Sequence, residues 1–275
     1  MDLSRFEPLI PVIPIALCIL FTILLFRRGA KKIIRLQKSL YEGRHEFRDV
    51  SPSEFPFLDL GFYDSKRDRL EKQGFRHMGD IEDVTAQKAV PSVKAFIRVM
   101  LSGDGAIVAG IYHARMFGRM RFMQSLGALT PDDKMKVVDF ETEFTNGLFL
   151  VTSNTEGTDR TGDVKGIVRI QRPPETPLEQ IYRLHLDNLG DILEKYPDMQ
   201  PVRLSNMKDI MESSHRIQEM KNAHKRSIGY MNAEELKRIA TPSLKGVADL
   251  TAREIERLKR EEKGELPNPR GKQPG

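Results

Sequence analysis

An acidic row on one predicted strand is the arrangement in this sequence best suited to chemistry. Asp139, Glu141 and Glu143 are spaced two residues apart, so their carboxylates share one face of a strand, about 7 Å from one to the next. Such a row can hold a divalent cation or form an acid–base pair, and His113, at the end of another predicted strand, is the histidine that could join it. A solvated sheet face explains the row as well, and we favour that interpretation because antiparallel sheets commonly have one polar side.

A second acidic group lies earlier in the chain. Asp80, Glu82 and Asp83 follow His77 on a segment that we expect to be a loop. Oxygen-rich clusters suit Mg²⁺ or Ca²⁺, but the spacing matches no established binding loop. We therefore regard the cluster as ordinary surface polarity, with a metal site as the alternative.

A polar stretch at the end of a predicted strand offers candidate ligand contacts. Thr152 and Asn154 belong to a run of four hydrogen-bonding side chains, and a glycine-bearing loop, 157–162, follows them. A loop of this kind can close over a ligand, in which case Thr152 and Asn154 would contact it. The alternative is a long turn with no ligand.

The well-marked catalytic motifs are missing from the sequence. It contains no G-x-x-x-x-G-K-[ST] phosphate loop, no G-x-G-x-x-G, no G-x-S-x-G, no H-E-x-x-H and no C-x-x-C. The one cysteine, Cys18, lies inside an apolar run, where it cannot act as an aqueous nucleophile. We therefore expect no cofactor, and we favour a binding function over catalysis.

Two hairpins are predicted to position the candidate residues. Residues 93–101 and 106–113 flank a turn at 102–105, and both runs are rich in strand-forming side chains. Residues 138–144 alternate strictly, and Asn146-Gly147 predicts a type I′ turn before a return strand at 148–153. Further strands are predicted at 116–123 and 166–170.

Helices are predicted around and after the strands. A Thr176/Glu179 capping box predicts a helix at 177–195, in which we expect His185 to be buried. Thr251 is expected to open a polar helix at 252–263. The other expected helix starts are Ser65, Ser205 and Asn232. Strands followed by helices predict an α+β fold: an antiparallel sheet of about four to six strands with helices on one face and a helical C-terminal extension.

An apolar run near the N-terminus predicts a membrane anchor. Residues 9–26 contain no charge, and a helix of about eighteen residues spans most of a bilayer core of ~30 Å. A cleaved signal peptide is the alternative, but residues 1–8 are not basic and no small-residue cleavage site follows the run. Six cations follow it within twelve residues: Arg27, Arg28, Lys31, Lys32, Arg35 and Lys38. The positive-inside rule then places the N-terminus outside and the body in the cytoplasm, at the plasma membrane.

The basic charge of the chain belongs to this juxtamembrane segment. The 275 residues carry a net charge of +5, residues 27–38 alone contribute six cations without an acid, and residues 1–26 sum to −1, so residues 39–275 are close to neutral. A folded body without a basic face argues against nucleic-acid binding. Anionic lipid head groups are the natural partners of the six cations, although fixing the topology is reason enough for them, and we favour that simpler role.

These observations predict a domain order and a function. The expected parts are an extracytoplasmic N-terminus (1–8), a transmembrane helix (9–26), a basic juxtamembrane segment and linker (27–63), an α+β domain (64–200), a helical extension (201–263) and a disordered tail (264–275). We expect a single-pass membrane protein whose cytoplasmic domain binds a protein partner or small ligand at the membrane surface, with the C-terminal helices as a docking segment. The alternatives are a membrane-tethered, metal-assisted hydrolase that uses the acidic row with His113, and a lipid-handling domain that takes an acyl chain beneath helix 177–195.

Overall fold

The computed structural model describes residues 12–125, 132–156, 163–239 and 245–265, and in the first helix it describes the side chains of Leu24 and of Phe26 onward. The chain forms two compact units. One, which we call the sheet unit, is Ser39–Ser227, and the other, the helical unit, combines Met1–Lys38 with Ile228–Gly275. The sheet unit therefore takes in both the segment 39–63 that precedes the predicted α+β domain and the first helix of the predicted extension.

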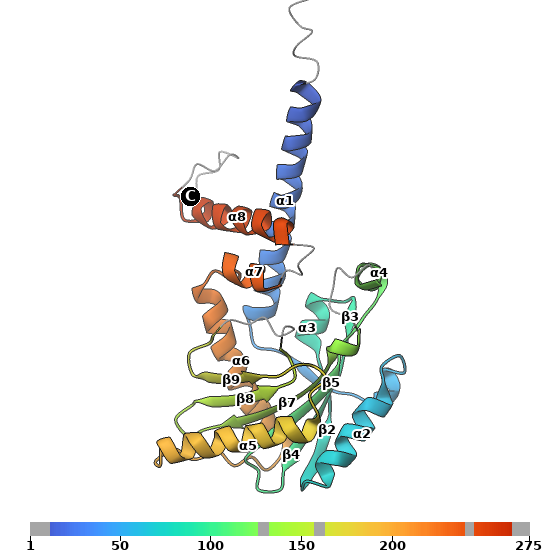
Figure 1. The fold of residues 1–275 in the computed structure, drawn as a ribbon, viewed down its shortest axis with the longest axis vertical. Coiled ribbons are helices and arrows are strands. Elements are labelled where there is room, and N and C mark those ends of the chain that lie inside the picture. Colours follow the sequence, from blue (N-terminus) through green and yellow to red (C-terminus); the bar gives the residue numbers. More distant parts are fainter. Residues whose placement is uncertain (1–11, 126–131, 157–162, 240–244, 266–275) are drawn as a thin grey trace, which may run out of the picture. The chain divides into compact units, whose positions relative to one another are not determined.

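A seven-stranded mixed sheet is the framework of the sheet unit (Figure 1). Neighbouring strands are antiparallel except β8 and β9, which are parallel. In sheet order the strands are β1 (Phe47–Asp49), β2 (Phe75–Asp83), β4 (Ile97–Ser102), β5 (Val108–His113), β7 (Lys136–Glu143), β8 (Phe149–Ser153) and β9 (Ile167–Gln171). The α+β class is confirmed, but the expectation of a wholly antiparallel sheet of four to six strands is wrong, because the linker segment contributes β1 and the chain after β8 returns as a parallel edge strand.

Both predicted hairpins are present. β4 pairs with β5, and β7 pairs with β8, each antiparallel. The second turn differs from the prediction: among the described residues only Tyr230 and certain glycines have positive φ, so Asn146 does not adopt the conformation that a type I′ turn requires. Gly147, at φ +82°, instead takes the left-handed position of a longer loop closed by a hydrogen bond from the Phe144 N–H to the Leu148 carbonyl at 2.8 Å.

Two helices cover one face of the sheet. α2 (Leu60–Glu71) and α5 (Leu178–Lys195) pack on this face, and their buried apolar side chains form the main core with those of the central strands. Tyr63 from α2 is fully buried and stacks on Phe96 with ring centroids 4.1 Å apart. Phe140, on the predicted apolar side of β7, is fully buried in the same core.

A third helix covers the opposite face, which corrects the prediction that helices pack on one face only. α6 (Met207–Ser227) contributes Ile210 and Ile217 to two further apolar clusters with strand residues such as Leu101 and Val151. Figure 1 shows α5 in front of the strands and α6 behind them. The strands therefore carry buried side chains on both faces, and the polar face expected for β7 lies beneath a helix.

Several helix boundaries and types differ from the sequence predictions. α2 begins five residues before Ser65, with Asp59 as its N-cap, and the predicted strand at 116–123 is replaced by the short β6 (Arg115–Met116) and α4 (Gly118–Ser125). α5 has the predicted extent, but Pro177 is its N-cap and no side chain caps it, so the capping box at Thr176 does not form. The remaining elements are η2 (Pro52–Glu54), α3 (Val84–Ala89), β3 (Val93–Lys94), which pairs with β6, and η3 (Asp132–Met135).

The helical unit contains α1 (Val12–Tyr41) up to Lys38, α7 (Ala233–Ile239) and α8 (Lys245–Glu262). Asn232 caps α7 as predicted, through a 2.8 Å bond from the Glu235 N–H, whereas α8 begins six residues before Thr251. A small apolar cluster joins the three helices; it includes Ala30, Leu236 and Ile255. Within the described part of the chain, no helix has both the length and the apolar character that crossing a membrane requires.

A buried polar trio lies beneath α5. His185 is fully buried; its Nε2 is 2.9 Å from the Thr142 hydroxyl, and its Nδ1 is 3.0 Å from the Thr152 hydroxyl. Burial lowers the pKa of His185 to about 3, so the folded protein holds a neutral ring. Both hydroxyls can either donate or accept, and a neutral imidazole needs one of each.

This trio predicts acid sensitivity of the fold. His185 in the unfolded chain takes up a proton below its ordinary pKa near 6.5, while the folded form stays neutral, so stability is greatest above that pH and falls as the pH drops towards 3. We expect the unfolding free energy of the native chain to lose about 1.4 kcal/mol per pH unit more than that of His185→Gln between pH 6 and pH 4. Urea denaturation across this range measures the difference, and parallel pH profiles would contradict it.

Candidate functional site

The residues of the proposed metal site do not converge. Asp139, Glu141 and Glu143 lie on the face of β7 that α6 covers, whereas His113 lies on the opposite face, in register beside the α2 and α5 core. Within the described ranges, no group of three or more His, Cys, Asp or Glu side chains is placed to hold a metal ion. The metal-assisted site drawn from these four residues is therefore not assembled.

The acidic row has structural partners instead. Glu143 is buried and accepts two bonds from the Arg216 guanidinium of α6, at 2.5 and 2.7 Å. Asp139 accepts a 3.0 Å bond from the backbone N–H of Gly110 on β5. The space that a β-carbon would need at Gly110 is filled by the Asp139 carboxylate, so a larger residue there would displace that carboxylate.

The second acidic cluster lies on β2 rather than on a loop, and its members are also paired. Buried Asp80 forms an ion pair with buried Arg98 at 2.9 Å, and Glu82 accepts a 2.6 Å bond from Arg48. Asp83 caps α3 and lies 2.6 Å from Nδ1 of His45. Paired carboxylates of this kind explain the cluster without a bound cation.

The polar stretch after β8 is part of the interior. Thr152 belongs to the trio beneath α5, and Asn154 is 5% exposed. The Asn154 side chain accepts from the Val138 N–H at 2.8 Å and donates to the Lys136 and Pro174 carbonyls. Both predicted ligand contacts therefore have structural hydrogen bonds, and residues 157–162 lie outside the described part of the chain.

His113 is the one predicted candidate that the structure places at a cleft. The side chain ends β5, is 2% exposed, and lines an open cleft of about 510 Å³. Two groups fix its position: the Tyr63 hydroxyl accepts from its backbone N–H at 2.7 Å, and its ring Nδ1 accepts from the Asp59 N–H at 3.2 Å. Tyr63 and Asp59 belong to the start of α2, so the helix that packs on the sheet also orients this ring.

The hydrogen bond at Nδ1 determines the chemistry of the other ring nitrogen. A backbone N–H can only donate, so Nδ1 of His113 carries no proton and the neutral ring has its proton on Nε2. Burial lowers the pKa of His113, which favours this neutral form. Nε2 is buried and has no hydrogen-bond partner among the described residues; the Asp132 carboxylate, at 3.8 Å, is too distant.

The walls of the cleft carry further charged groups. Lys136 lines it and forms an ion pair with Asp59 at 2.5 Å. Arg115 and Asp132 line it too, and each has one buried polar atom, Nε and Oδ1 respectively, without a hydrogen-bond partner in the described structure. The remaining lining residues are Pro56, Phe57 and Leu58.

Three buried polar atoms of the lining have no hydrogen-bond partner in the described structure. Two buried donors, Nε2–H of His113 and Nε–H of Arg115, and one buried acceptor on Asp132 lack partners, and unpaired buried polar groups are costly unless a ligand or water satisfies them. The described lining contains no serine, threonine or cysteine that could attack a substrate. A small molecule with an anionic group and a hydroxyl or amino group would satisfy all three atoms.

Sequence reasoning identified His113 but missed its neighbours. Asp59 precedes α2 as an N-cap, a signal that was readable, but the start of that helix was placed at Ser65. Arg115 lies one residue before the strand predicted at 116–123, and in the structure it belongs to β6. Lys136 is distant from His113 in the chain but lies directly opposite it in the sheet. That pairing follows from the sheet register, which the sequence did not specify.

The predicted membrane-surface cations lie in the helical unit. Arg27 forms a 2.6 Å ion pair with Glu261 of α8, and Lys38 lies 5.4 Å from the ring centroid of Tyr230. The other four are exposed on α1: Arg28, Lys31, Lys32 and Arg35.

The surroundings of His113 predict how its pKa responds to substitution. The Asp132 carboxylate raises this pKa and the Lys136 ammonium lowers it, against the larger lowering by burial. We expect a pKa below 6.5 in the native chain, a lower one in Asp132→Asn and a higher one in Lys136→Met. Nitrogen-detected NMR of the ring against pH measures all three, and a proton on Nδ1 at neutral pH would contradict the geometry.

Comparison with known proteins adds no relative to these observations. No protein-family model, no curated protein and no solved structure matches the chain. A functional assignment therefore depends on the contacts of the site and on the composition of the chain.

Proposed function

We propose that the chain is a membrane-anchored binding protein whose sheet unit binds a small organic anion in the His113 cleft. The observation that carries this proposal is the buried Nε2–H of His113, a residue of the cleft lining, which has no partner in the described structure. Asp59 and Tyr63 fix the position of this donor, which lowers the cost of ordering it when an acceptor binds.

The charges around the cleft support an anionic ligand. Arg115 contributes a cation at the lining, the second lining cation, Lys136, is paired with Asp59, and Arg121 lies 3.8 Å from Asp132. Asp59 is already paired with Lys136, so the Asp132 carboxylate is the acceptor left for a hydroxyl or amino group of the ligand. The cleft is large enough for a molecule of a few carbon atoms.

The two alternative functions have less support. A metal-assisted hydrolase would need the acidic row and His113 on one face of the sheet, and they lie on opposite faces. An acyl chain beneath α5 would need apolar space where the His185 trio and buried Leu178 and Ile181 lie.

The membrane anchor is supported by the sequence and by the extent of α1. Residues 9–26 carry no charge, and most of them belong to a helix that continues without a break to Tyr41. Four exposed cations follow on the same helix, and by the positive-inside rule they support an orientation with the sheet unit in the cytoplasm.

The ligand proposal predicts selective binding of a hydroxy acid. We expect malate to bind the full chain more tightly than succinate, which lacks the hydroxyl, because only malate can also donate to Asp132. His113→Asn should weaken malate binding about tenfold or more, since a lost hydrogen bond to a charged group is worth about 1.5–3 kcal/mol. Isothermal titration calorimetry measures both affinities.

Two control variants make the result interpretable. His215→Asn changes a histidine that lines a different cleft and should leave malate affinity unchanged. Asp132→Asn should remove the preference for malate over succinate. If malate, succinate and inorganic phosphate all fail to bind at millimolar concentration, the proposed ligand class is wrong.

The anchor proposal predicts resistance to alkaline carbonate. The native chain should remain in the membrane pellet, whereas Ile19→Arg with Leu20→Arg should move it to the supernatant, because each arginine near the centre of a span costs about 2.5–3.5 kcal/mol. Val168→Arg with Leu186→Arg adds the same charge at exposed positions of the sheet unit and should leave the chain in the pellet. Release of the native chain by carbonate would refute the anchor.

A further inference from the structure

The third helix of the helical unit crosses α1 just past the end of the apolar run. Figure 1 shows α8 lying across α1 rather than along it. The contact is made by Ala30 of α1 with Ala252 and Ile255 in one apolar cluster, to which Ile33 and Ile34 also belong. The 2.6 Å ion pair of Arg27 with Glu261 places α8 beside the first charged residue after the run.

Two acidic residues of α8, Glu254 and Glu261, are turned inward, whereas the side chains of Glu256 and Glu262 are more exposed. The side chain of Glu261 is 9% exposed, between Arg27 of α1 and Arg257, and Glu254 is 15% exposed at 3.3 Å from Arg257. The ion pairs neutralise these carboxylates, so they contribute little to the charge that an approaching partner meets.

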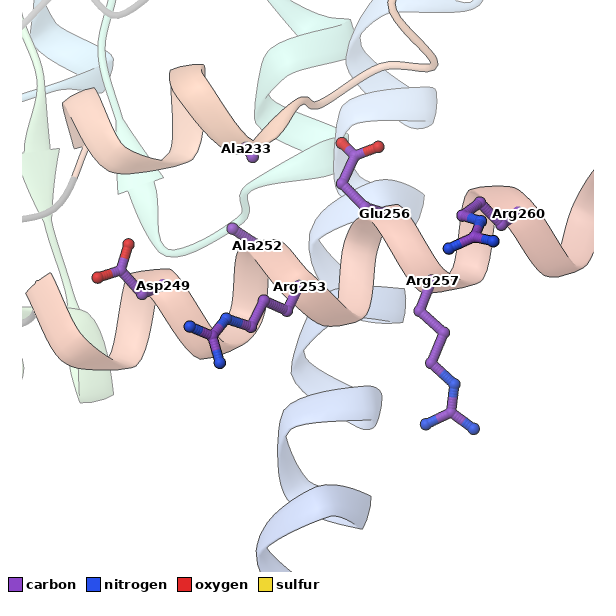
Figure 2. A pocket seen from close by; sticks show the side chains of 7 residues that line it. All are labelled: Ala233, Asp249, Ala252, Arg253, Glu256, Arg257 and Arg260. Carbon is purple, nitrogen blue, oxygen red and sulfur yellow. The ribbon is translucent and has the colours of Figure 1, made fainter. Parts of the chain in front are cut away.

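The exposed surface of α8 is apolar at one end and carries three arginines further along. Val247 and Leu250 are 49% and 44% exposed, and Arg253, Arg257 and Arg260 follow at helical spacing and are exposed as well. The three arginines line an open hollow of about 560 Å³ together with two acidic residues, Asp249 and Glu256. Figure 2 shows Glu256 pointing towards α7 and Arg257 pointing to the opposite side of α8.

The neighbouring surface of α1 has the same character. Leu24 is 46% exposed, and Arg28, Lys31, Lys32 and Arg35 are exposed beyond it. Exposed leucine and valine next to a row of cations is the composition of a helix that lies in a membrane interface, where apolar side chains enter the head-group boundary and cations bind lipid phosphates.

We infer that α8 lies flat on the surface of the membrane that α1 enters, and that Arg253, Arg257 and Arg260 bind the phosphate groups of anionic lipids there. This inference rests on the proposed anchor, because a helix that crosses α1 at Arg27 lies at head-group depth when α1 stands in the bilayer. Charge complementarity favours anionic lipid over a protein partner: each exposed arginine near such a surface contributes about 1 kcal/mol.

The test uses the full chain with Cys18→Ser and a single spin label at Leu250→Cys, reconstituted into vesicles of phosphatidylcholine with or without phosphatidylserine. With phosphatidylserine, we expect the ratio of oxygen to nickel accessibility at the label to rise several-fold, and to fall again at high salt because screening weakens exposed ion pairs. A label at Val168→Cys, exposed on the sheet unit, is the reference for water accessibility.

Charge-matched variants link the response to the arginines. The double variant Arg253→Gln with Arg260→Gln should abolish most of the rise in the accessibility ratio that phosphatidylserine causes. Arg257 is left unchanged because it pairs with two glutamates. Arg69→Gln with Arg203→Gln removes the same charge from the sheet unit and should leave the effect intact.

The outcomes separate this inference from the anchor. Flotation of the chain with phosphatidylcholine vesicles after carbonate treatment tests the anchor alone and does not depend on the spin label. One outcome is that the chain floats while the label at position 250 stays as water-accessible in phosphatidylserine vesicles as the label at 168. That result would refute the interfacial position of α8 and leave the anchor intact. The exposed surface of α8 would then be free for a protein partner.

Discussion

Both faces of the seven-stranded sheet are covered, by α2 and α5 on one side and by α6 on the other, so the polar side chains on its strands must find partners inside the protein. Glu143 forms an ion pair with Arg216, and Asp80 forms one with Arg98. Thr142 and Thr152 both hydrogen-bond to His185. Each pairing fixes a helix to the sheet or one strand to another, because leaving either partner alone would cost far more than the pair gains. The interior is therefore held in register by polar contacts as well as by apolar packing.

His113 differs from these residues, because one of its polar atoms has no partner in the described structure. Its backbone N–H and its Nδ1 are satisfied by the start of α2, while Nε2 is buried and has no partner in the described structure. An unpartnered polar atom at a surface would mean little, since water would bind it. At 2% exposure, beside unpaired atoms of Arg115 and Asp132, it is the basis on which we propose a ligand.

The sequence was sufficient for the elements with strong local signals. The alternation at 138–144 and the flanking turns located both hairpins, and the apolar spacing at 178–193 located α5. The acidic row was misread because alternation alone does not reveal what covers the polar side: Glu143 faces Arg216, 73 residues further along the chain. The same limit applies to the site, since Asp59, His113 and Lys136 meet only through helix packing and strand register.

The contact between Gly110 and Asp139 has a consequence for how this chain tolerates substitution. The carboxylate of one strand occupies the volume that any side chain on the other would need, and it also accepts the neighbouring backbone N–H. A change at either position affects the other: a larger residue at 110 displaces the carboxylate, and loss of the carboxylate leaves an unfilled hollow and an unpaired donor. Substitutions at the two positions are therefore coupled, so the cost of a change at one depends on the residue at the other.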